Sequence, residues 1–171
     1  MTYLAVTVLG HDRPGIIAST ADALASCGMN LEDSSMTLLR GHFAMTLICA
    51  GEATPAQIES ALSPLFDDTL TVSVREVPVE SERPPLGDPF LITVHGADRL
   101  GIVAQVARVL ADAGGNITDL TTRLAGDLYV LVAEVDLPAD LDVPELEARI
   151  AEVADELGVE VSLRPVERDD L

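Results

Sequence analysis

Two short loops of similar sequence carry the residues with the clearest binding chemistry. Residues 10–18 read GHDRPGIIA and residues 96–104 read GADRLGIVA, at an offset of 86 positions. Each loop contains an aspartate, an arginine and a glycine. It follows an apolar segment and precedes a segment whose apolar residues recur at helical spacing. A strand that enters a helix through such a loop leaves backbone N–H groups free to meet an anion. The pattern therefore favours binding of a small anionic or zwitterionic ligand.

The two loops belong to a longer internal repeat. The same offset aligns further pairs: Leu24 with Leu110, Gly28 with Gly114, Asn30 with Asn116 and Asp33 with Asp119. Two copies of one unit within 171 residues predict two small domains, at residues 1–78 and 89–171. Residues 79–88 read VESERPPLGD, which has no periodicity and contains two adjacent prolines, so we expect this segment to be the linker.

Each copy shows the same order of expected strands and helices. The first has strands at residues 3–9, 30–40, 42–50 and 70–77, and helices at 14–27 and 55–66. The second has strands at 90–95, 116–125, 128–135 and 159–166, and helices at 102–113 and 141–157. This β-α-β-β-α-β order predicts an α+β fold of two ferredoxin-like units, each an antiparallel four-stranded sheet with two helices on one face. The free edges and faces need cover, which a second copy can supply.

The composition limits the partners of the chain. It carries 29 acidic residues against ten basic ones, all of them arginine, for a net charge of −19. This excess of carboxylates disfavours direct contact with nucleic acid and with an anionic membrane surface, because both present phosphates. The sequence shows no leader and no apolar run of membrane-spanning length, so we expect a cytoplasmic protein. Cys27 and Cys49 are isolated, which is typical of reduced, buried thiols.

The repeated pattern of Gly-x-Asp-Arg-x-Gly-Ile-[Ile/Val]-Ala, a helix, Gly-x-Asn and a hairpin resembles the ACT domain, a small-molecule sensing module. The tandem arrangement without a fused enzyme is similar to stand-alone double-ACT proteins, among them glycine-cleavage-repressor-like regulators. The resemblance implies units that pair side by side into an eight-stranded sheet and bind an amino acid or similar metabolite where two units meet. It also implies regulation of a partner, such as an enzyme or a transcription factor, without catalysis and without a cofactor. Because each sheet otherwise leaves an apolar face or edge exposed, we expect the two units to share one sheet or to pack sheet to sheet, either within a chain or in a homodimer.

The resemblance places a ligand at two equivalent sets of residues. They are His11, Asp12, Arg13, Pro14, Gly15 and Asn30 in the first unit and Ala97, Asp98, Arg99, Leu100, Gly101 and Asn116 in the second. A ligand carboxylate would accept hydrogen bonds from N–H groups near Gly15 or Gly101, helped by the helix dipole. A ligand ammonium would meet the aspartate of the loop or the amide oxygen of the asparagine. The small residues Gly10 and Gly96 would let the backbone approach the ligand.

Most of these residues also fit a structural role. Both loop aspartates can cap the helix that follows, both loop arginines can be solvated or paired locally, and both asparagines can form turns behind a helix. Pro14 fits the first turn of a helix. The copies also differ, since His11 corresponds to Ala97 and Pro14 to Leu100. We therefore expect two sites of unequal affinity or one silent site. Because Pro14 gives the first loop a stiffer entry, we expect substitution there to cost more binding.

Other chemistries find less support in the sequence. His11, His42 and His95 do not repeat between the copies, so no metal site is expected. No Ser-His-Asp or Cys-His arrangement stands out. One alternative is an acylphosphatase-like hydrolase that uses Arg13 and Asn30. The other is a structural or interaction module whose ligand loops are vestigial.

Overall fold

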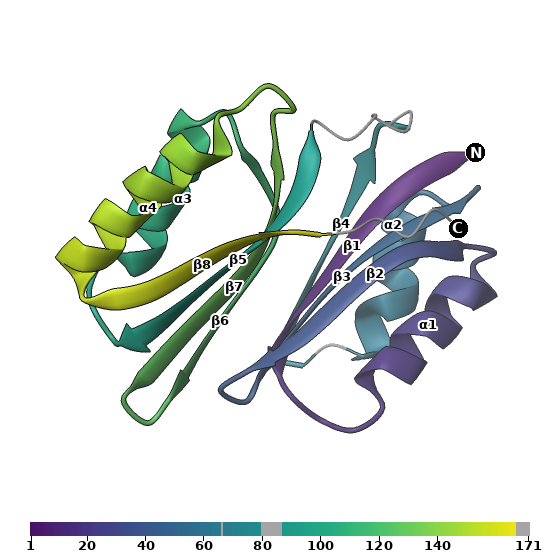
Figure 1. The fold of residues 1–171 in the computed structure, drawn as a ribbon. Coiled ribbons are helices and arrows are strands. Elements are labelled where there is room, and N and C mark those ends of the chain that lie inside the picture. The colour runs from purple at the N-terminus through teal and green to yellow at the C-terminus, as the bar shows by residue number, and fades with distance from the viewer. Residues whose placement is uncertain (66, 80–86, 167–171) are drawn as a thin grey trace. The chain divides into compact units, whose positions relative to one another are not determined.

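The chain forms two compact units in the computed structural model, which describes residues 1–65, 67–79 and 87–166 (Figure 1). The predicted linker at 79–88 falls largely on residues outside this described part, as does the predicted tail at 168–171. The domain boundaries therefore stay a prediction. No helix in the described ranges has the length and apolar character needed to cross a membrane.

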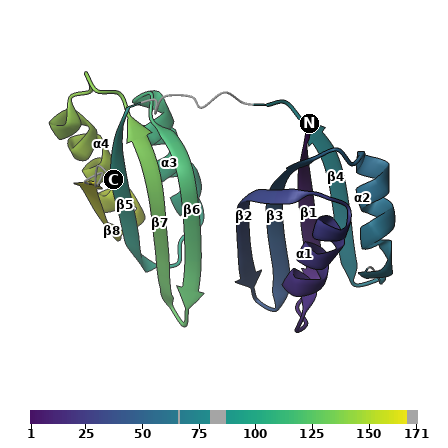
Figure 2. The ribbon, with the colours of Figure 1, turned by 90° about the vertical axis from the view of Figure 1, so that its right-hand side faces the viewer.

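The first unit is a four-stranded antiparallel sheet in the order β2-β3-β1-β4. Its elements are β1 (Thr2–His11), α1 (Ile16–Ser26), β2 (Asn30–Leu39), β3 (His42–Gly51), α2 (Pro55–Leu62), the 3-10 turn η1 (Ser63–Leu65) and β4 (Leu70–Val77). Both helices cover the same face of this sheet (Figures 1 and 2).

The second unit repeats this topology in the strand order β6-β7-β5-β8. Its elements are β5 (Asp88–Ala97), α3 (Ile102–Asp112), β6 (Asn116–Ala125), β7 (Leu128–Leu137), α4 (Val143–Leu157) and β8 (Val159–Pro165). Helices α3 and α4 again lie together on one face of their sheet (Figure 2). The predicted α+β class and the ferredoxin-like units are confirmed.

Each core is built from every second residue of the central strands, where buried and outward-facing side chains alternate. Leu4, Val6 and Val8 of β1 are fully buried beneath the helices, while the residues between them face the other side of the sheet. The core of the second unit is built likewise, with Ile92 and Val94 of β5 fully buried. Full burial of each such side chain contributes about 1.5–3 kcal/mol to stability.

Several local signals are confirmed by the structure. Gly28 ends α1 in the left-handed conformation at a φ of 72°, and the Met29 N–H donates to the Leu24 carbonyl at 3.0 Å. Thr54 and Gln57 form the expected capping box at the start of α2. Gly126 lies in the predicted turn between β6 and β7.

Other boundaries differ from the prediction for identifiable reasons. α1 begins at Ile16, so Pro14 is not in its first turn. β2 ends at Leu39 because Arg40 and Gly41, at φ values of 51° and 84°, form the two-residue hairpin turn. α2 ends at Leu62 and continues only as the turn η1, while Phe66 lies outside the described residues.

Candidate functional site

The β1–α1 loop and the β5–α3 loop each expose the first turn of a helix. The N-cap residues are Gly15 and Gly101, with φ values of 91° and 93° that a residue with a Cβ adopts only under strain. No described side chain caps either helix, so the alternative interpretation of Asp12 and Asp98 as helix caps is wrong. The first intrahelical bond of α1 runs from the Ser19 N–H to the Gly15 carbonyl, at 2.9 Å. The N–H groups before it have no helical partner and form a site of partial positive charge.

An open hollow lies in front of each exposed helix start. In the second unit it has a volume of about 510 Å³ and is lined by residues 98–104 and Tyr129. In the first it has a volume of about 470 Å³ and is lined by residues 12–18, Met36 and Phe43. Both volumes fall within the range of about 300–1,000 Å³ that is usual for small-molecule sites. The structure therefore brings an aspartate, an arginine and free N–H groups to one hollow in each unit.

The strand residues in these hollows were missed by the sequence analysis. Phe43 of β3 pairs with Gly10, and Tyr129 of β7 pairs with Gly96, so the two aromatic residues occupy equivalent positions. The offset of 86 positions aligns them and was the signal that could have found them. Only Tyr129 adds a hydroxyl group that can hydrogen-bond a ligand.

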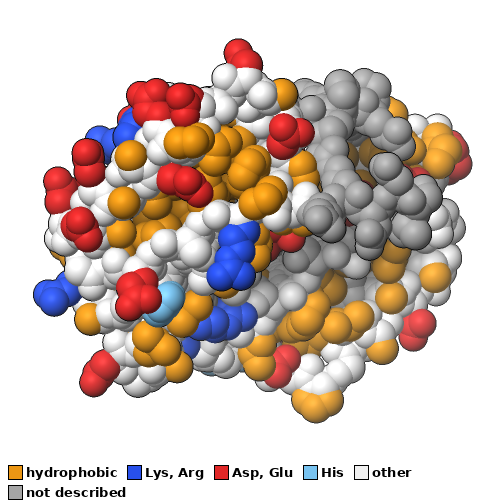
Figure 3. Space-filling model, in the orientation of Figure 1, with side chains coloured by type: hydrophobic (Ala, Val, Ile, Leu, Met, Phe, Trp, Pro, Cys, Tyr) orange, Lys and Arg blue, Asp and Glu red, His pale blue; other side chains and the backbone are white. Residues whose placement is uncertain are grey.

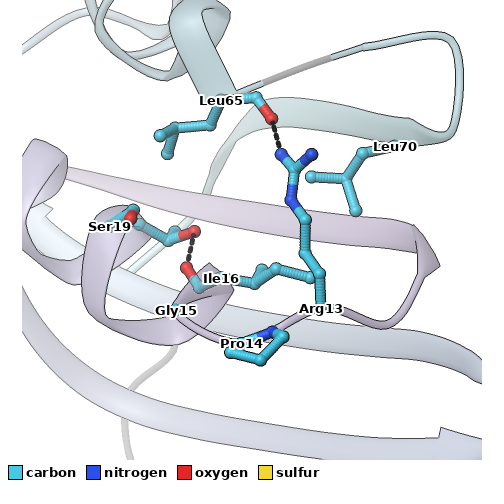
Figure 4. A pocket seen from close by; sticks show the side chains of 8 residues that line it. Arg13, Pro14, Gly15, Ile16, Ser19, Leu65 and Leu70 are labelled. Atoms are coloured by element: carbon cyan, nitrogen blue, oxygen red, sulfur yellow. Dashed lines mark hydrogen bonds between the residues drawn. The ribbon is translucent and has the colours of Figure 1, made fainter.

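Arg13 is held by the segment that leads into β4. Its Nη1 donates to Oδ2 of Asp67 at 2.5 Å. Its Nη2 donates to the Leu65 carbonyl at 2.6 Å, as Figure 4 shows. Asp67 also accepts hydrogen bonds from the Thr69 hydroxyl and N–H. Thr69 and Arg13 together lower the pKa of the Asp67 carboxyl from 3.8 to about 2. The Arg13 guanidinium is therefore committed to the protein itself.

The contact of Arg13 also leaves a second, much smaller cavity. It has a volume of about 60 Å³ and lies between Arg13, Gly15, Ser19, Leu65 and Leu70, among others (Figure 4). A cavity of this size holds one or a few water molecules and excludes an amino acid. The larger, open hollow lined by residues 12–18, Met36 and Phe43 is thus the ligand candidate of this unit.

Arg99, the counterpart of Arg13, has no hydrogen bond or ion pair among the described residues. The cause is the different approach to the last strand. α4 continues to Leu157, and β8 follows at Val159 after a single glycine, so no connection like that of Asp67 exists there. Arg99 therefore lines its hollow with a guanidinium that none of the described residues binds.

The other predicted site residues lie elsewhere. Asn30 opens β2 opposite Ala50, which pairs with Tyr3 at the start of β1, eight residues before His11. At about 3.3 Å per residue, Asn30 is roughly 26 Å from the loop of its own unit. Asn116 opens β6 in the same way, and both asparagines are exposed. Neither asparagine therefore lies at the loop of its own unit, where the sequence prediction placed it.

The end residues of β1 and β5 also contribute little to the hollows. His11 and Ala97 are exposed but do not line them, although sequence analysis placed both in the site. A Cβ at Gly10 would collide with the backbone of Thr69, and one at Gly96 with Val159. Glycine is required there because the neighbouring strand passes close, so ligand approach is not the reason.

The alternative chemistries gain no geometric support within the described residues. Arg13 is bound to Asp67 while Asn30 lies at the opposite end of the sheet, so the pair assumed for an acylphosphatase does not form. No group of three or more His, Cys, Asp or Glu side chains is arranged to hold a metal ion in the described ranges. Cys49 is buried, which raises the pKa of its thiol, and Cys27 is a second free thiol.

Comparisons with known proteins agree with this architecture. A family model described as the ACT domain matches residues 2–75 and again residues 88–164. The glycine cleavage system transcriptional repressor of Escherichia coli is 26% identical over 174 residues, covering 96% of this chain and 90% of the repressor. A UPF0237 protein of Methanopyrus kandleri is 43% identical over 72 residues, or 42% of this chain and 80% of that protein.

Solved structures show the same fold across the whole chain. A protein of unknown function from Galdieria sulphuraria is 31% identical with a TM-score of 0.79, covering 97% of this chain and 99% of that one. A putative glycine cleavage system transcriptional repressor has a TM-score of 0.70 at 17% identity, with 98% of each chain covered. At that identity the second likeness supports the fold alone.

Proposed function

The chain belongs to the ACT-domain family, and we propose that it is a non-catalytic regulatory protein that binds an amino acid or a similar small zwitterion at its loops. The observation that carries this proposal is the uncapped helix start beside an open hollow and an aspartate, which occurs once in each unit. Free N–H groups suit a carboxylate, and the aspartate suits an ammonium.

The second unit offers the more complete set of ligand contacts. A ligand carboxylate would accept hydrogen bonds from the N–H groups of Ile102, Val103 and Ala104, which line the hollow. Asp98 would bind the ammonium group. Arg99 and the Tyr129 hydroxyl remain to recognise a polar or anionic side chain of the ligand. We therefore propose the second hollow as the stronger site.

The edges of both sheets support a role for a second copy. β2 is an edge strand whose Met36 and Leu38 side chains are 46% and 48% exposed. Leu120 and Leu124 of the edge strand β6 are exposed to a similar extent. An antiparallel partner strand on β2 would cover its unpaired backbone groups and apolar side chains.

Such pairing also explains the distant asparagines. When two copies of β2 run antiparallel, the start of one lies beside the end of the other. Since β2 ends next to His42 and the β1–α1 loop, Asn30 of one copy would approach the loop of its partner. We propose a homodimer on this basis, with ligand sites that two units complete together.

Signalling would then pass to another protein. The face shown in Figure 3 carries scattered acidic side chains and few basic ones, in keeping with the net charge of −19. Phosphates would be repelled, so an effect on transcription would act through a protein partner. The Escherichia coli relative is named as a transcriptional repressor. A regulated enzyme or a transcription factor both fit this proposal.

Calorimetry on the full chain against each of the twenty amino acids tests the proposed function. We expect one or a few of them to bind with micromolar to millimolar affinity and to protect the protein from heat, because a ligand of the native state stabilises it. Silence towards all twenty would favour an interaction module with vestigial loops. Turnover of an acyl phosphate would favour a hydrolase.

A further inference from the structure

Two of the three histidines meet on the sheet of the first unit. His11 ends β1 and His42 begins β3, and the antiparallel register places them directly opposite each other. Their ring centroids are 5.0 Å apart, with the ring planes inclined by 36°. Both side chains are exposed. By the alternation along β1 they lie on the face opposite to Val6 and Val8, away from the helices and the ligand hollow.

We propose that His11 and His42 together bind one divalent transition metal ion, independently of the amino-acid site. Neutral imidazole nitrogens are preferred ligands of Zn²⁺, Ni²⁺ and Cu²⁺, whereas Mg²⁺ and Ca²⁺ prefer oxygen. An ion held by two imidazole nitrogens at about 2.1 Å, with an angle of about 105° between them, places the ring centroids about 5 Å apart. The observed spacing agrees with this value.

The backbone on both sides holds the pair in place before any ion binds. The His11 N–H donates to the Thr69 carbonyl of the neighbouring chain segment at 3.1 Å. The next N–H, that of Asp12, donates to the Gly41 carbonyl at 3.1 Å, which ties the start of the loop to the turn before His42. Since the two Cβ positions are fixed and the rings are exposed, only side-chain rotation is needed to direct both nitrogens at one ion. Little ordering of the chain opposes binding.

The number of protein ligands determines how firmly the ion is held. Within the described ranges no third His, Cys, Asp or Glu joins the pair, so water or a small anion completes the coordination. An ion held by only two side chains is expected to exchange with ions in solution. It also crosslinks β1 and β3 of the native state, and so stabilises the first unit when metal is present.

The second unit supplies the internal control. The equivalent cross-strand pair there is Ala97 opposite Leu128, which offers no ligand. The remaining histidine, His95, lies on β5 and pairs with Glu160 at 3.1 Å. A site that depends on the His11–His42 geometry is therefore confined to one unit.

Titration of the tag-free, chelator-treated full chain with NiCl2 tests the proposal. We expect one Ni²⁺ per chain, with affinity reduced at least tenfold in both His11→Ala and His42→Ala and unchanged in His95→Ala. MgCl2 should not compete. Because the replaced side chains are exposed, circular dichroism of each variant should match that of the wild type. Absence of stoichiometric binding would overturn the proposal. Unchanged binding in His42→Ala would also overturn it, because the Ni²⁺ would then be bound by scattered carboxylates.

Two further measurements test the geometry directly. Ni²⁺ should raise the unfolding temperature of the wild-type chain and leave that of His42→Ala unchanged. The double variant Ala97→His, Leu128→His builds the same pair in the second unit and should add a second bound Ni²⁺. Failure of either result would contradict the claim that these two opposed strand ends form the site.

Discussion

The two loops share the Asp-Arg-x-Gly pattern and yet differ in what their arginine does. Arg13 is bound to Asp67 and to the Leu65 carbonyl, while Arg99 has no partner among the described residues and faces a hollow of about 510 Å³. The difference arises outside the loops, in the segment before the last strand of each unit. The same arginine of a repeated motif is thus bound within the protein in one copy and has no such partner among the described residues in the other.

This contrast reverses an expectation based on the loops alone. The stiff entry given by Pro14 favoured the first loop as the more sensitive one. The second hollow contains the Tyr129 hydroxyl and Arg99, which none of the described residues binds, whereas the first contains Phe43 and the paired Arg13. We therefore expect ligand binding to depend more on the second loop than on the first.

The largest effect is expected from the aspartate that would meet the ligand ammonium. Asp98→Asn removes the negative charge, so the affinity for the amino acid that binds should fall tenfold or more, or at least about 1.4 kcal/mol. Asp12→Asn should cost less. Calorimetry on both variants measures this, with the exposed Asp140→Asn at the other end of the unit as a control. Equal losses in Asp98→Asn and Asp12→Asn would break the contrast between the loops.

Substitution of either N-cap glycine should lower the stability of its unit by a similar amount, and this effect concerns folding rather than ligand binding. Gly15→Ala and Gly101→Ala each force a Cβ into a left-handed conformation, at a cost of about 1–2 kcal/mol to the unit concerned. Neither Cβ would meet an atom closer than 3.7 Å, so backbone strain is the cause rather than collision. Urea unfolding followed separately for each unit measures the cost. A neutral result at either site would contradict the uncapped, left-handed entry to the helix.

A smaller effect is expected from the aromatic pair of the hollows. Tyr129→Phe removes a single hydroxyl, which is worth about 0.5–1.5 kcal/mol if it hydrogen-bonds the ligand. The reciprocal Phe43→Tyr should improve binding at the first hollow or leave it unchanged. Binding isotherms of the two variants compare the positions. An unchanged affinity in Tyr129→Phe would show that the hydroxyl does not hydrogen-bond the ligand.

The smallest effect concerns the pH dependence of the first unit. The pKa of Asp67 is lowered from 3.8 to about 2 by Thr69 and Arg13, so the ionised carboxylate stabilises the folded state. This stability is present above pH 4 and is lost as the pH falls from about 4 to about 2. Asp67→Asn should lose stability at neutral pH and show a flatter dependence in that window. Denaturation curves of the variant and the wild type at several pH values measure the difference, and an identical pH dependence would contradict the hydrogen bonds of Asp67 with Thr69 and Arg13.

The sequence was sufficient for the repeat and for most elements, because these depend on local periodicity. Helix-ending glycines, the capping box at Thr54 and the hairpin turns follow from residues close in the chain. The offset of 86 positions also located both loops, and with them Asp12 and Asp98.

The features missed depend on contacts between distant segments. Gly10 pairs with Leu70 but Gly96 pairs with Val159, so the repeat offset grows to 89 positions at the last strand. The extra length lies in helix α4, which is longer than its counterpart α2. Because α4 leads almost directly into the last strand, the second unit lacks a segment equivalent to the one that binds Arg13 in the first unit. The partnership of His11 with His42 likewise follows from strand register rather than from spacing. The free N–H groups came from the left-handed Gly15 and Gly101, which the expectation of an aspartate cap did not foresee.

The most direct test of the account is a backbone amide NMR titration of the full chain with the amino acid that calorimetry identifies. We expect the largest shifts at the N–H groups of Ile102, Val103 and Ala104, with smaller shifts at residues 16–18. Shifts confined to other parts of the chain, with these amides unmoved at saturation, would contradict the claim that the uncapped helix start is where the ligand binds.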